Sequence, residues 1–460
     1  MRKINLKLPV RASVWYTGAS LVAKGVGFLI TPFFTRMISG QAYGELTLYL
    51  TLVGIASVSC SAVNTGSAIY KGIKDFRNEK GSFLKSALLV SLSFSAAFCI
   101  VLFAFSSFWG LDDHLFILLT LQILCDSIIA IGLSSAKFSY RYKEVAFDSI
   151  LSYVLPAIIT LALLKTVNGR FRVRVYSLLT ISIFLALWSL IKIFREGGQA
   201  NKKMSVALLK SSLPLIPHSI SSALSGQADK MIITYFLGAY ALAKYSVTHS
   251  LGVGLQFIVS SVGFALGPWM MRKLDAKEHH NVAYLIEMLI FGVSALCICL
   301  IALAPEAMRI LAPPEYLDAF PALLPIVITT PISLISSVVT ICLTFLGRGK
   351  AMVNMALAGA GASLILNFTL IPKFGYLGAG LALFLSAFSS MSVGIYLLRK
   401  EKLLEILSPK KNSRKFLFTT GVSYLVFLLF EVLALRVLIL IIPAVMLLNA
   451  FYNTRSLIVE

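Results

Sequence analysis

Residues 282–304 read VAYLIEMLIFGVSALCICLIALA, a stretch of 23 residues in which Glu287 is the single charged side chain. About 20 consecutive apolar residues are what an α-helix needs to cross the hydrocarbon core of a bilayer. The whole chain has this character, because 58% of its 460 residues are hydrophobic and 13% are charged, whereas soluble domains average about 25% charged residues. This composition excludes a water-soluble globular protein, a disordered chain and a fibrous repeat. It predicts an all-α polytopic membrane protein.

Apolar segments of membrane-spanning length recur along the entire sequence. A window of about 19 residues predicts about fourteen transmembrane helices. They lie near 13–35, 45–70, 83–108, 114–136, 147–164, 175–192, 210–237, 242–270, 282–304, 320–346, 352–372, 375–398, 416–431 and 436–452. The longest connection, 399–415, is too short to hold a soluble catalytic domain.

The basic residues indicate the orientation in the membrane. The chain carries 41 Lys and Arg against 20 Asp and Glu, a net charge of +21. They lie in short clusters between apolar runs, and not on one folded domain as nucleic-acid binding requires. With a cytoplasmic N-terminus and alternating spans, 30 of them fall on the cytoplasmic side and 9 on the other, which follows the positive-inside rule. We therefore predict cytoplasmic N- and C-termini and loops that bind anionic membrane lipids. The segment 165–174 opposes the rule with four basic residues.

The sequence lacks the motifs of metal sites, cofactors and common hydrolases. All six cysteines lie in apolar runs and no CxxC pair occurs, so neither a disulfide framework nor a zinc site is predicted. There is no P-loop, HExxH or GxSxG motif, which argues against ATP-driven transport and against these enzyme classes. We expect no cofactor and no metal.

Ionisable residues inside the predicted spans are the main functional candidates. One at mid-span costs roughly 2.5–3.5 kcal/mol on the insertion scale, so it usually faces a bundle interior or a wet cavity. Lys24, beside Gly25 and Gly27, either offers a cation to an anionic substrate or pairs with a buried carboxylate such as Asp126. Asp126, beside Gln122, is alternatively a proton carrier or a helix–helix hydrogen-bonding residue.

Four further residues complete the candidate set. Asp229 and Lys230 are predicted either to line a cavity together or to have no such role. In the second case Lys230 extends its ammonium toward the membrane surface. Arg36 ends the first span as an interface anchor or a cavity cation, and His249 is a hydrogen-bonded core residue or a relay. The substrate-binding cations are predicted to be Lys24, Arg36 and Lys230. The predicted ion-coupling or polar cavity residues are Asp126, Asp229 and His249.

Three motifs resemble a known transporter family. Residues 27–44 read GFLITPFFTRMISGQAYG, LPLIPH at 213–218 is followed by ADKM and YFLG, and 367–382 read NFTLIPKFGYLGAGLA. In this order they resemble the first span, the seventh span and the junction of spans 11 and 12 of the polysaccharide-transport family. That family includes the O-antigen and capsule-type lipid-linked oligosaccharide flippases of the multidrug/oligosaccharidyl-lipid/polysaccharide exporter superfamily. The resemblance covers almost the whole chain.

The resemblance implies a particular architecture. Two six-helix lobes would be related by a pseudo-two-fold axis around a central cavity, followed by a C-terminal helical hairpin. The N-lobe would then occupy residues 1–200 with spans 1–6, and the C-lobe residues 201–400 with spans 7–12. Residues 401–460 would hold a linker and spans 13 and 14.

It also implies a function. The chain would be a flippase, not an enzyme, in the bacterial inner membrane. It would carry an undecaprenyl-pyrophosphate-type lipid-linked oligosaccharide, such as an O-antigen repeat unit, from the cytoplasmic to the periplasmic leaflet by alternating access. An ion gradient is a candidate driving force, and a glycan polymerase and chain-length proteins are candidate partners. Buried Lys or Arg suits this substrate, because a cation attracts pyrophosphate more strongly at low dielectric than in water.

Two alternatives remain. One is a cation-coupled exporter of drugs or other small molecules from the same superfamily, although Lys24 and the single Asp126 do not form the acidic cavity that cationic drugs favour. The other is a membrane glycan polymerase or transferase, whose catalytic residues typically lie in a sizeable outer loop. The predicted outer loops are short and carry no clustered acid–base set.

Overall fold

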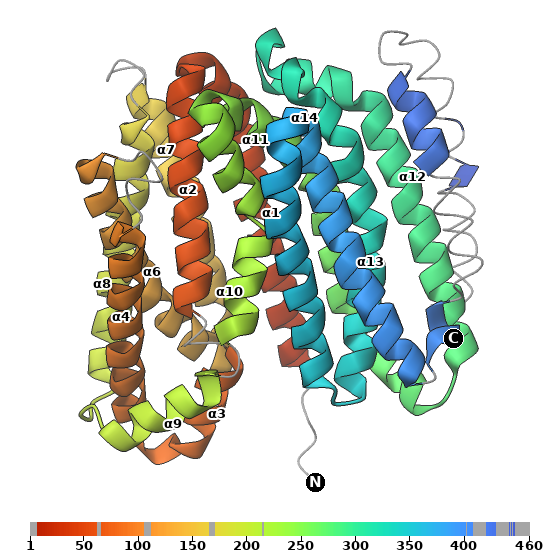
Figure 1. The fold of residues 1–460 in the computed structure, drawn as a ribbon. Helices are drawn as coiled ribbons and strands as arrows, with labels where there is room; N and C mark the ends of the chain where they lie inside the picture. Colours follow the sequence, from red (N-terminus) through yellow and green to blue (C-terminus); the bar gives the residue numbers. More distant parts are fainter. Residues whose placement is uncertain are drawn as a thin grey trace. The chain divides into compact units, whose positions relative to one another are not determined.

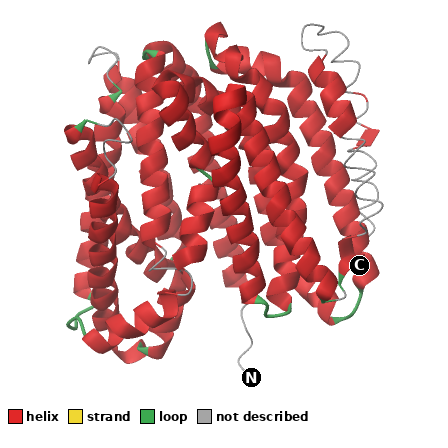
Figure 2. Ribbon diagram, in the orientation of Figure 1, coloured by secondary structure: helices red, strands yellow, loops and turns green. Residues whose placement is uncertain are grey.

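The structure is a computed structural model that describes residues 7–61, 66–104, 112–164, 171–213, 216–401, 403–407 and 420–428, with residues 441, 443, 445 and 446. Within these ranges all regular secondary structure is helical and no strand occurs (Figure 2). Eight helical segments of the described chain are long and apolar enough to cross a membrane. The predicted all-α, polytopic class is confirmed.

The helices follow one another with short connections (Figure 1). The first ten elements are α1 (Lys7–Met37), α2 (Gly40–Ser61), α3 (Gly66–Asp75), η1 (Arg77–Glu79), α4 (Lys80–Ala104), α6 (Asp113–Phe138), α7 (Tyr142–Leu164), α8 (Arg172–Arg195), α9 (Lys202–Ser212) and α10 (Ile216–Ser225). The remainder are α11 (Ala228–Asp275), α12 (His279–Leu311), η3 (Pro314–Ala322), α13 (Leu323–Phe345), α14 (Gly349–Lys400) and η4 (Leu404–Leu407).

The predicted spans agree with these helices in most places and differ in two. Helix α2 ends at Ser61, before the predicted limit at 70. The segment 210–237, predicted as one span, is divided among α9, α10 and α11, with a turn at Gly226–Gln227 between the last two. The last two predicted spans, 416–431 and 436–452, lie largely outside the described residues.

Two long helices bend at a single glycine. Helix α11 continues through Gly238 (φ 84°, ψ 171°), and α14 continues through Gly375 (φ 57°, ψ −129°). Both φ values lie in the left-handed region, which glycine adopts without the Cβ clash that other residues suffer. These are the points where the sequence predicts a boundary between two spans, so each pair of spans is joined by one non-helical residue.

The chain divides into two compact units, Met1–Ala243 and Lys244–Glu460. In the first unit, α1 packs on α7, and α6 packs on α2, α4 and α8. In the second unit, α13 packs on α12 and α14, and η3 packs on α14. The lobe limits at 200 and 400 that the resemblance implies stay predictions.

Helices α3 and α9 are short and lie across one end of α4 (Figure 1). Met204 and Leu208 of α9 are buried in a cluster that contains Ile69 of α3 and Phe83 of α4. Burial of such side chains contributes roughly 1.5–3 kcal/mol each. This cluster holds α9, and with it the connection after α8, against α3 and α4.

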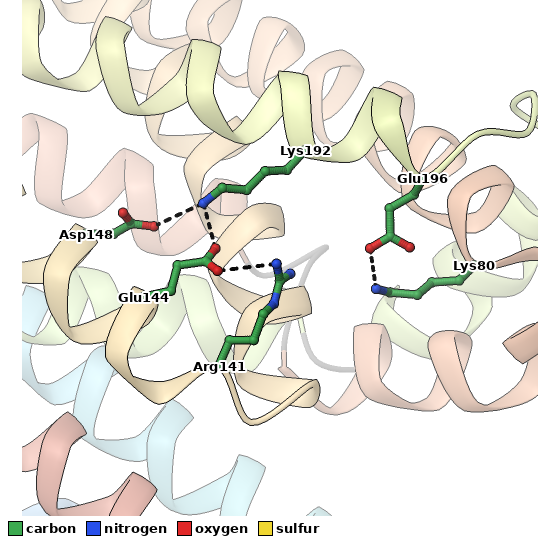
Figure 3. Close-up of polar contacts among 6 residues, drawn as sticks. All are labelled: Lys80, Arg141, Glu144, Asp148, Lys192 and Glu196. Carbon is green, nitrogen blue, oxygen red and sulfur yellow. Dashed lines mark hydrogen bonds and ion pairs between the residues drawn. The ribbon is translucent and has the colours of Figure 1, made fainter.

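Polar contacts fasten the connection 196–201 to the start of α4. Lys80 Nζ lies 2.5 Å from Glu196 Oε1 (Figure 3), and Asn201 N donates to Ser86 Oγ at 2.8 Å. A Cβ added at Gly81 would overlap the carbonyl oxygen of Glu196. The chain therefore approaches α4 backbone to backbone here, and only glycine fits.

We expect Glu196→Gln to lower the free energy of unfolding by less than about 1 kcal/mol, because the pair is partly exposed and such pairs contribute little. The side chains of Lys80 and Glu196 are 23% and 31% exposed. Thermal unfolding of the purified protein in detergent measures the change, and Lys80→Gln with the double variant separates the pair energy from other effects. A loss several times larger would show that the ion pair, and not the apolar cluster, holds the connection.

Candidate functional site

Asp126 is at the centre of a polar cluster within the first unit. Ser57 Oγ of α2 donates to Asp126 Oδ2 at 2.7 Å, and Gln122 Nε2 donates to Asp126 Oδ1 at 2.8 Å. Gln122 lies one turn before Asp126 on α6, so the two side chains share a helix face. Gln122 Nε2 also donates to Ser182 Oγ of α8 at 2.7 Å. The cluster thus joins α2, α6 and α8.

Polar atoms around this cluster retain hydrogen-bonding capacity. Gln122 Oε1 and Tyr49 Oη are buried and find no hydrogen-bond partner within the described part of the chain. Buried polar atoms are nearly always paired with protein groups or with water, so each exception needs an explanation. A carboxylate surrounded by neutral oxygens can take up a proton or a small cation. No group of three or more His, Cys, Asp and Glu residues suited to a metal ion occurs among the described residues.

Two predicted cations lie on α1. The backbone of Lys24 is in this helix, but its side chain lies outside the described residues, so neither a cavity role nor a Lys24–Asp126 pair is tested. Arg36 lies in the last turn, where Nη1 donates to Pro32 O at 3.1 Å on the exposed side of the helix. The substrate-binding role of both residues stays a prediction.

Lys230 lies at the start of α11 and is linked through Gln227 to α2, the helix that also contacts Asp126. Its Nζ donates to Gln227 Oε1 at 2.9 Å. Gln227 in turn lies beside Gly54, with Nε2 3.9 Å from a Cβ built there. Gly54 and Ser57 are three residues apart and therefore neighbours on the surface of α2. Helix α2 thus contacts both the Asp126 cluster and the residue that holds Lys230.

Asp229 and Lys230 both lie in the first turn of α11, where the helix dipole stabilises a negative charge and destabilises a positive one. A carboxylate near a helix N-terminus is stabilised by the helix dipole, whereas a cation there is not. Asp229 is 2% exposed, and Lys230 is partly buried. Asp229 thus has a structural reason for its place, and Lys230 does not.

His249 belongs to the second unit. It is 8% exposed, and its ring centroid lies 5.5 Å from that of Tyr245 one turn earlier on α11. In the same unit, Lys244 Nζ lies 2.5 Å from Asp318 Oδ2. The roles assigned to Asp229 and His249 from the sequence are untested.

Sequence reasoning missed several of the residues involved. Ser57, Ser182 and Tyr49 have no sequence signal, because hydroxyl side chains are common in membrane helices. It also missed a charged network at the ends of α7 and α8 (Figure 3). Glu144 and Asp148 are four residues apart on α7, a spacing that places two carboxylates on one helix face and that was available as a signal.

The basic segment that opposes the positive-inside rule is partly explained. Helices α7 and α8 both form, so the segment connects them as predicted. Arg172 Nη2 lies 2.7 Å from Asp112 Oδ2, and Arg174 is 9% exposed. Lys165 and Arg170 lie outside the described residues.

Comparison with known sequences gives a consistent set of relatives. The family described as "Polysaccharide biosynthesis protein" matches residues 10–274. "Lsg locus putative protein 1" of Haemophilus influenzae is 22% identical over 275 residues, covering 58% of this chain and 67% of that protein. "Succinoglycan biosynthesis transport protein ExoT" of Rhizobium meliloti is 21% identical over 380 residues, covering 78% and 74%.

Solved structures share the fold. The inward closed conformation of the lipid II flippase MurJ aligns with a TM-score of 0.72 at 15% identity, covering 98% of this chain and all of that one. An inward-facing multidrug resistance MATE family transporter of the MOP superfamily aligns with a TM-score of 0.58 at 15% identity, covering 85% and 95%. Both likenesses concern the fold.

Proposed function

Because the chain belongs to the polysaccharide biosynthesis protein family, we propose that it flips an isoprenyl-pyrophosphate-linked oligosaccharide across the bacterial inner membrane. The substrate is a surface-polysaccharide repeat unit such as an O-antigen unit, and it moves from the cytoplasmic to the periplasmic leaflet. The observation that carries this proposal is the family match over residues 10–274 together with the fold shared with a lipid II flippase. The relative ExoT, described as a transport protein of succinoglycan biosynthesis, supports the same class of substrate.

Lys230 is the described residue best suited to the pyrophosphate. Its ammonium is partly buried, is held by a neutral amide and lies at the positive end of a helix. Both the ammonium and the free N–H groups of a helix N-terminus favour an oxyanion. In this proposal Lys24 and Arg36 supply further positive charge, and the glycan follows a wet route while the isoprenyl chain remains in lipid.

Replacing Lys230 with glutamine is expected to weaken binding of the lipid-linked substrate roughly tenfold. A hydrogen bond to a charged group contributes about 1.5–3 kcal/mol, and 1.4 kcal/mol corresponds to a factor of ten. The measurement is equilibrium binding of an isoprenyl-pyrophosphate oligosaccharide to purified protein, with Lys230→Arg as the control that keeps the charge. Equal affinity of the Gln variant and the wild type would remove Lys230 from the site.

Asp126 is proposed to couple transport to an ion gradient. Its carboxylate binds a proton or a singly charged cation in one state and releases it in another, and rearrangement of its hydrogen bonds links this event to α2, α6 and α8. Gln122 Oε1 and Tyr49 Oη have no hydrogen-bond partner among the described residues, so these oxygens can bind a cation or a water molecule attached to it. This supports the proposal.

Reconstitution tests the function directly. Purified protein in proteoliposomes is supplied with a lipid-linked oligosaccharide that carries a fluorescent label on the sugar, and a membrane-impermeant reductant reports the label on the outer leaflet. We expect the labelled head group to equilibrate between leaflets at a rate that depends on protein. A cationic dye serves as the second substrate. Transport of the dye without transport of the glycan lipid would identify a small-molecule exporter and contradict the proposal.

A further inference from the structure

A groove between α7 and α8 lies apart from the Asp126 cluster. On α7 it is lined by Glu144, Phe147 and Asp148, and on α8 by Phe184, Trp188 and Lys192. Spacings of three and four residues place each set on one face of its helix. The groove encloses a volume of about 240 Å³. Its walls are therefore formed by two helices and not by a loop.

One end of the groove carries charges of both signs. Lys192 Nζ lies 2.6 Å from Glu144 Oε1 and 3.9 Å from Asp148 Oδ2 (Figure 3). Arg141 Nη1 lies 3.2 Å from Glu144 Oε2. Glu144 is thus shared between two cations, whereas Asp148 has one cation at a distance too long for a hydrogen bond. The four side chains sum to zero charge.

Asp148 is a buried carboxylate with unused acceptor capacity. The residue is 7% exposed, and the hydrogen bonds of the described chain include none to its carboxylate oxygens. A buried charge is costly unless it is paired and hydrogen-bonded. Asp148 is one of the residues that line the groove, so a donor bound there can reach its carboxylate.

Aromatic side chains form the rest of the walls. Lys192 Nζ already lies 4.6 Å from the centre of the Trp188 ring, so that ring face attracts an ammonium group, as cation–π geometry requires. Phe147 and Phe184 are 64% and 57% exposed and form an apolar entrance. Both helices are long enough and apolar enough to cross the membrane, so this entrance opens toward lipid chains.

We propose that the groove binds a phospholipid whose head group carries both a phosphate and a primary ammonium, the class of phosphatidylethanolamine. The ammonium donates to Asp148 between Phe147 and Trp188, the phosphate lies near Lys192 and Arg141, and the acyl chains follow Phe184 into the bilayer. A zwitterion matches two cations and two carboxylates, whereas an anionic head group without an ammonium, such as phosphatidylglycerol, would leave Asp148 without a cationic donor. This assignment is independent of the transported substrate.

Lipid titration followed by native mass spectrometry tests the site on the full-length protein. We expect phosphatidylethanolamine to bind at least tenfold more tightly than phosphatidylglycerol, which lacks the ammonium, and than phosphatidylcholine, whose quaternary nitrogen cannot donate. Asp148→Asn should reduce the affinity for phosphatidylethanolamine to that for phosphatidylglycerol. Glu401→Gln is the matched control, since it removes a carboxylate just after α14 that pairs with Arg348 just before α14, and it should leave the affinity unchanged.

Three results would overturn the assignment. The first is equal affinity of the wild type for phosphatidylethanolamine and phosphatidylglycerol, which needs no variant and so holds even where Asp148→Asn fails to fold. The second is an affinity for phosphatidylcholine equal to that for phosphatidylethanolamine. The third is an Asp148→Asn protein that retains the wild-type preference.

Discussion

Replacing Gly44 with alanine is expected to lower the free energy of unfolding by about 3 kcal/mol or more, at the upper end of what overpacking costs. A Cβ at Gly44, near the start of α2, would overlap the carbonyl oxygen and carbonyl carbon of Ala239, which follows the bend at Gly238. Both clashing atoms are backbone, so no side-chain rotation relieves the overlap, and the two helices have to separate.

The midpoint of heat-induced unfolding in detergent measures this effect, and a drop of about 3–6 °C is expected. Gly361→Ala in α14 is the control, because a Cβ there meets no heavy atom within 4 Å. Alanine in a helix interior is favoured over glycine by roughly 0.5–1 kcal/mol, so this variant should be neutral or slightly stabilised. Equal midpoints for the two variants would mean that α2 does not pack against the Gly238 bend.

Replacing Asp126 with asparagine is expected to slow gradient-driven transport at least tenfold while the protein folds and still binds its substrate. The amide has the same shape and still accepts from Ser57, so the contacts among α2, α6 and α8 are largely kept. What is lost is the charge that takes up and releases an ion, and 1.4 kcal/mol of lost coupling suffices for a tenfold effect.

The proteoliposome assay with an imposed proton or sodium gradient separates these steps. Asp113→Asn is the matched control, since Asp113 lies in the first turn of the same helix and is exposed. A variant at position 126 that retains the wild-type gradient dependence would exclude Asp126 from coupling. A variant that loses substrate binding in parallel would assign Asp126 to the substrate site.

Hydrophobic length and glycine placement made much of the fold predictable. The run 282–304 falls within one helix, α12, and the boundaries predicted near 238 and 375 coincide with glycines whose backbone only glycine adopts readily. The division of 210–237 into three helices was missed, although the segment holds two prolines and the polar run SGQADK at 225–230, which signal breaks in an apolar span. Helices α3 and α9 are too short and too charged for a span search to find them.

The residues of the candidate site could be singled out from the sequence only where a charge stands out in an apolar helix, and their roles stay predictions. Asp126 and Lys230 are visible for this reason, and the structure gives each a defined partner. The donors to Asp126 come from residues 57 and 122, and a partner 69 positions away in sequence leaves no periodic signal. The groove between α7 and α8 was missed because its charges lie at helix ends, where a solvated residue is the ordinary expectation.

The attachment of α9 to the start of α4 determines where the polypeptide can be divided. If the gene is split into two co-expressed fragments, a break after 213 leaves Met204 and Leu208 on the same fragment as the residues that bury them. A break at 200 puts these side chains on the other fragment, and their apolar faces are exposed until the pieces meet. Complementation should therefore succeed with the later break and yield aggregated first fragments with the earlier one.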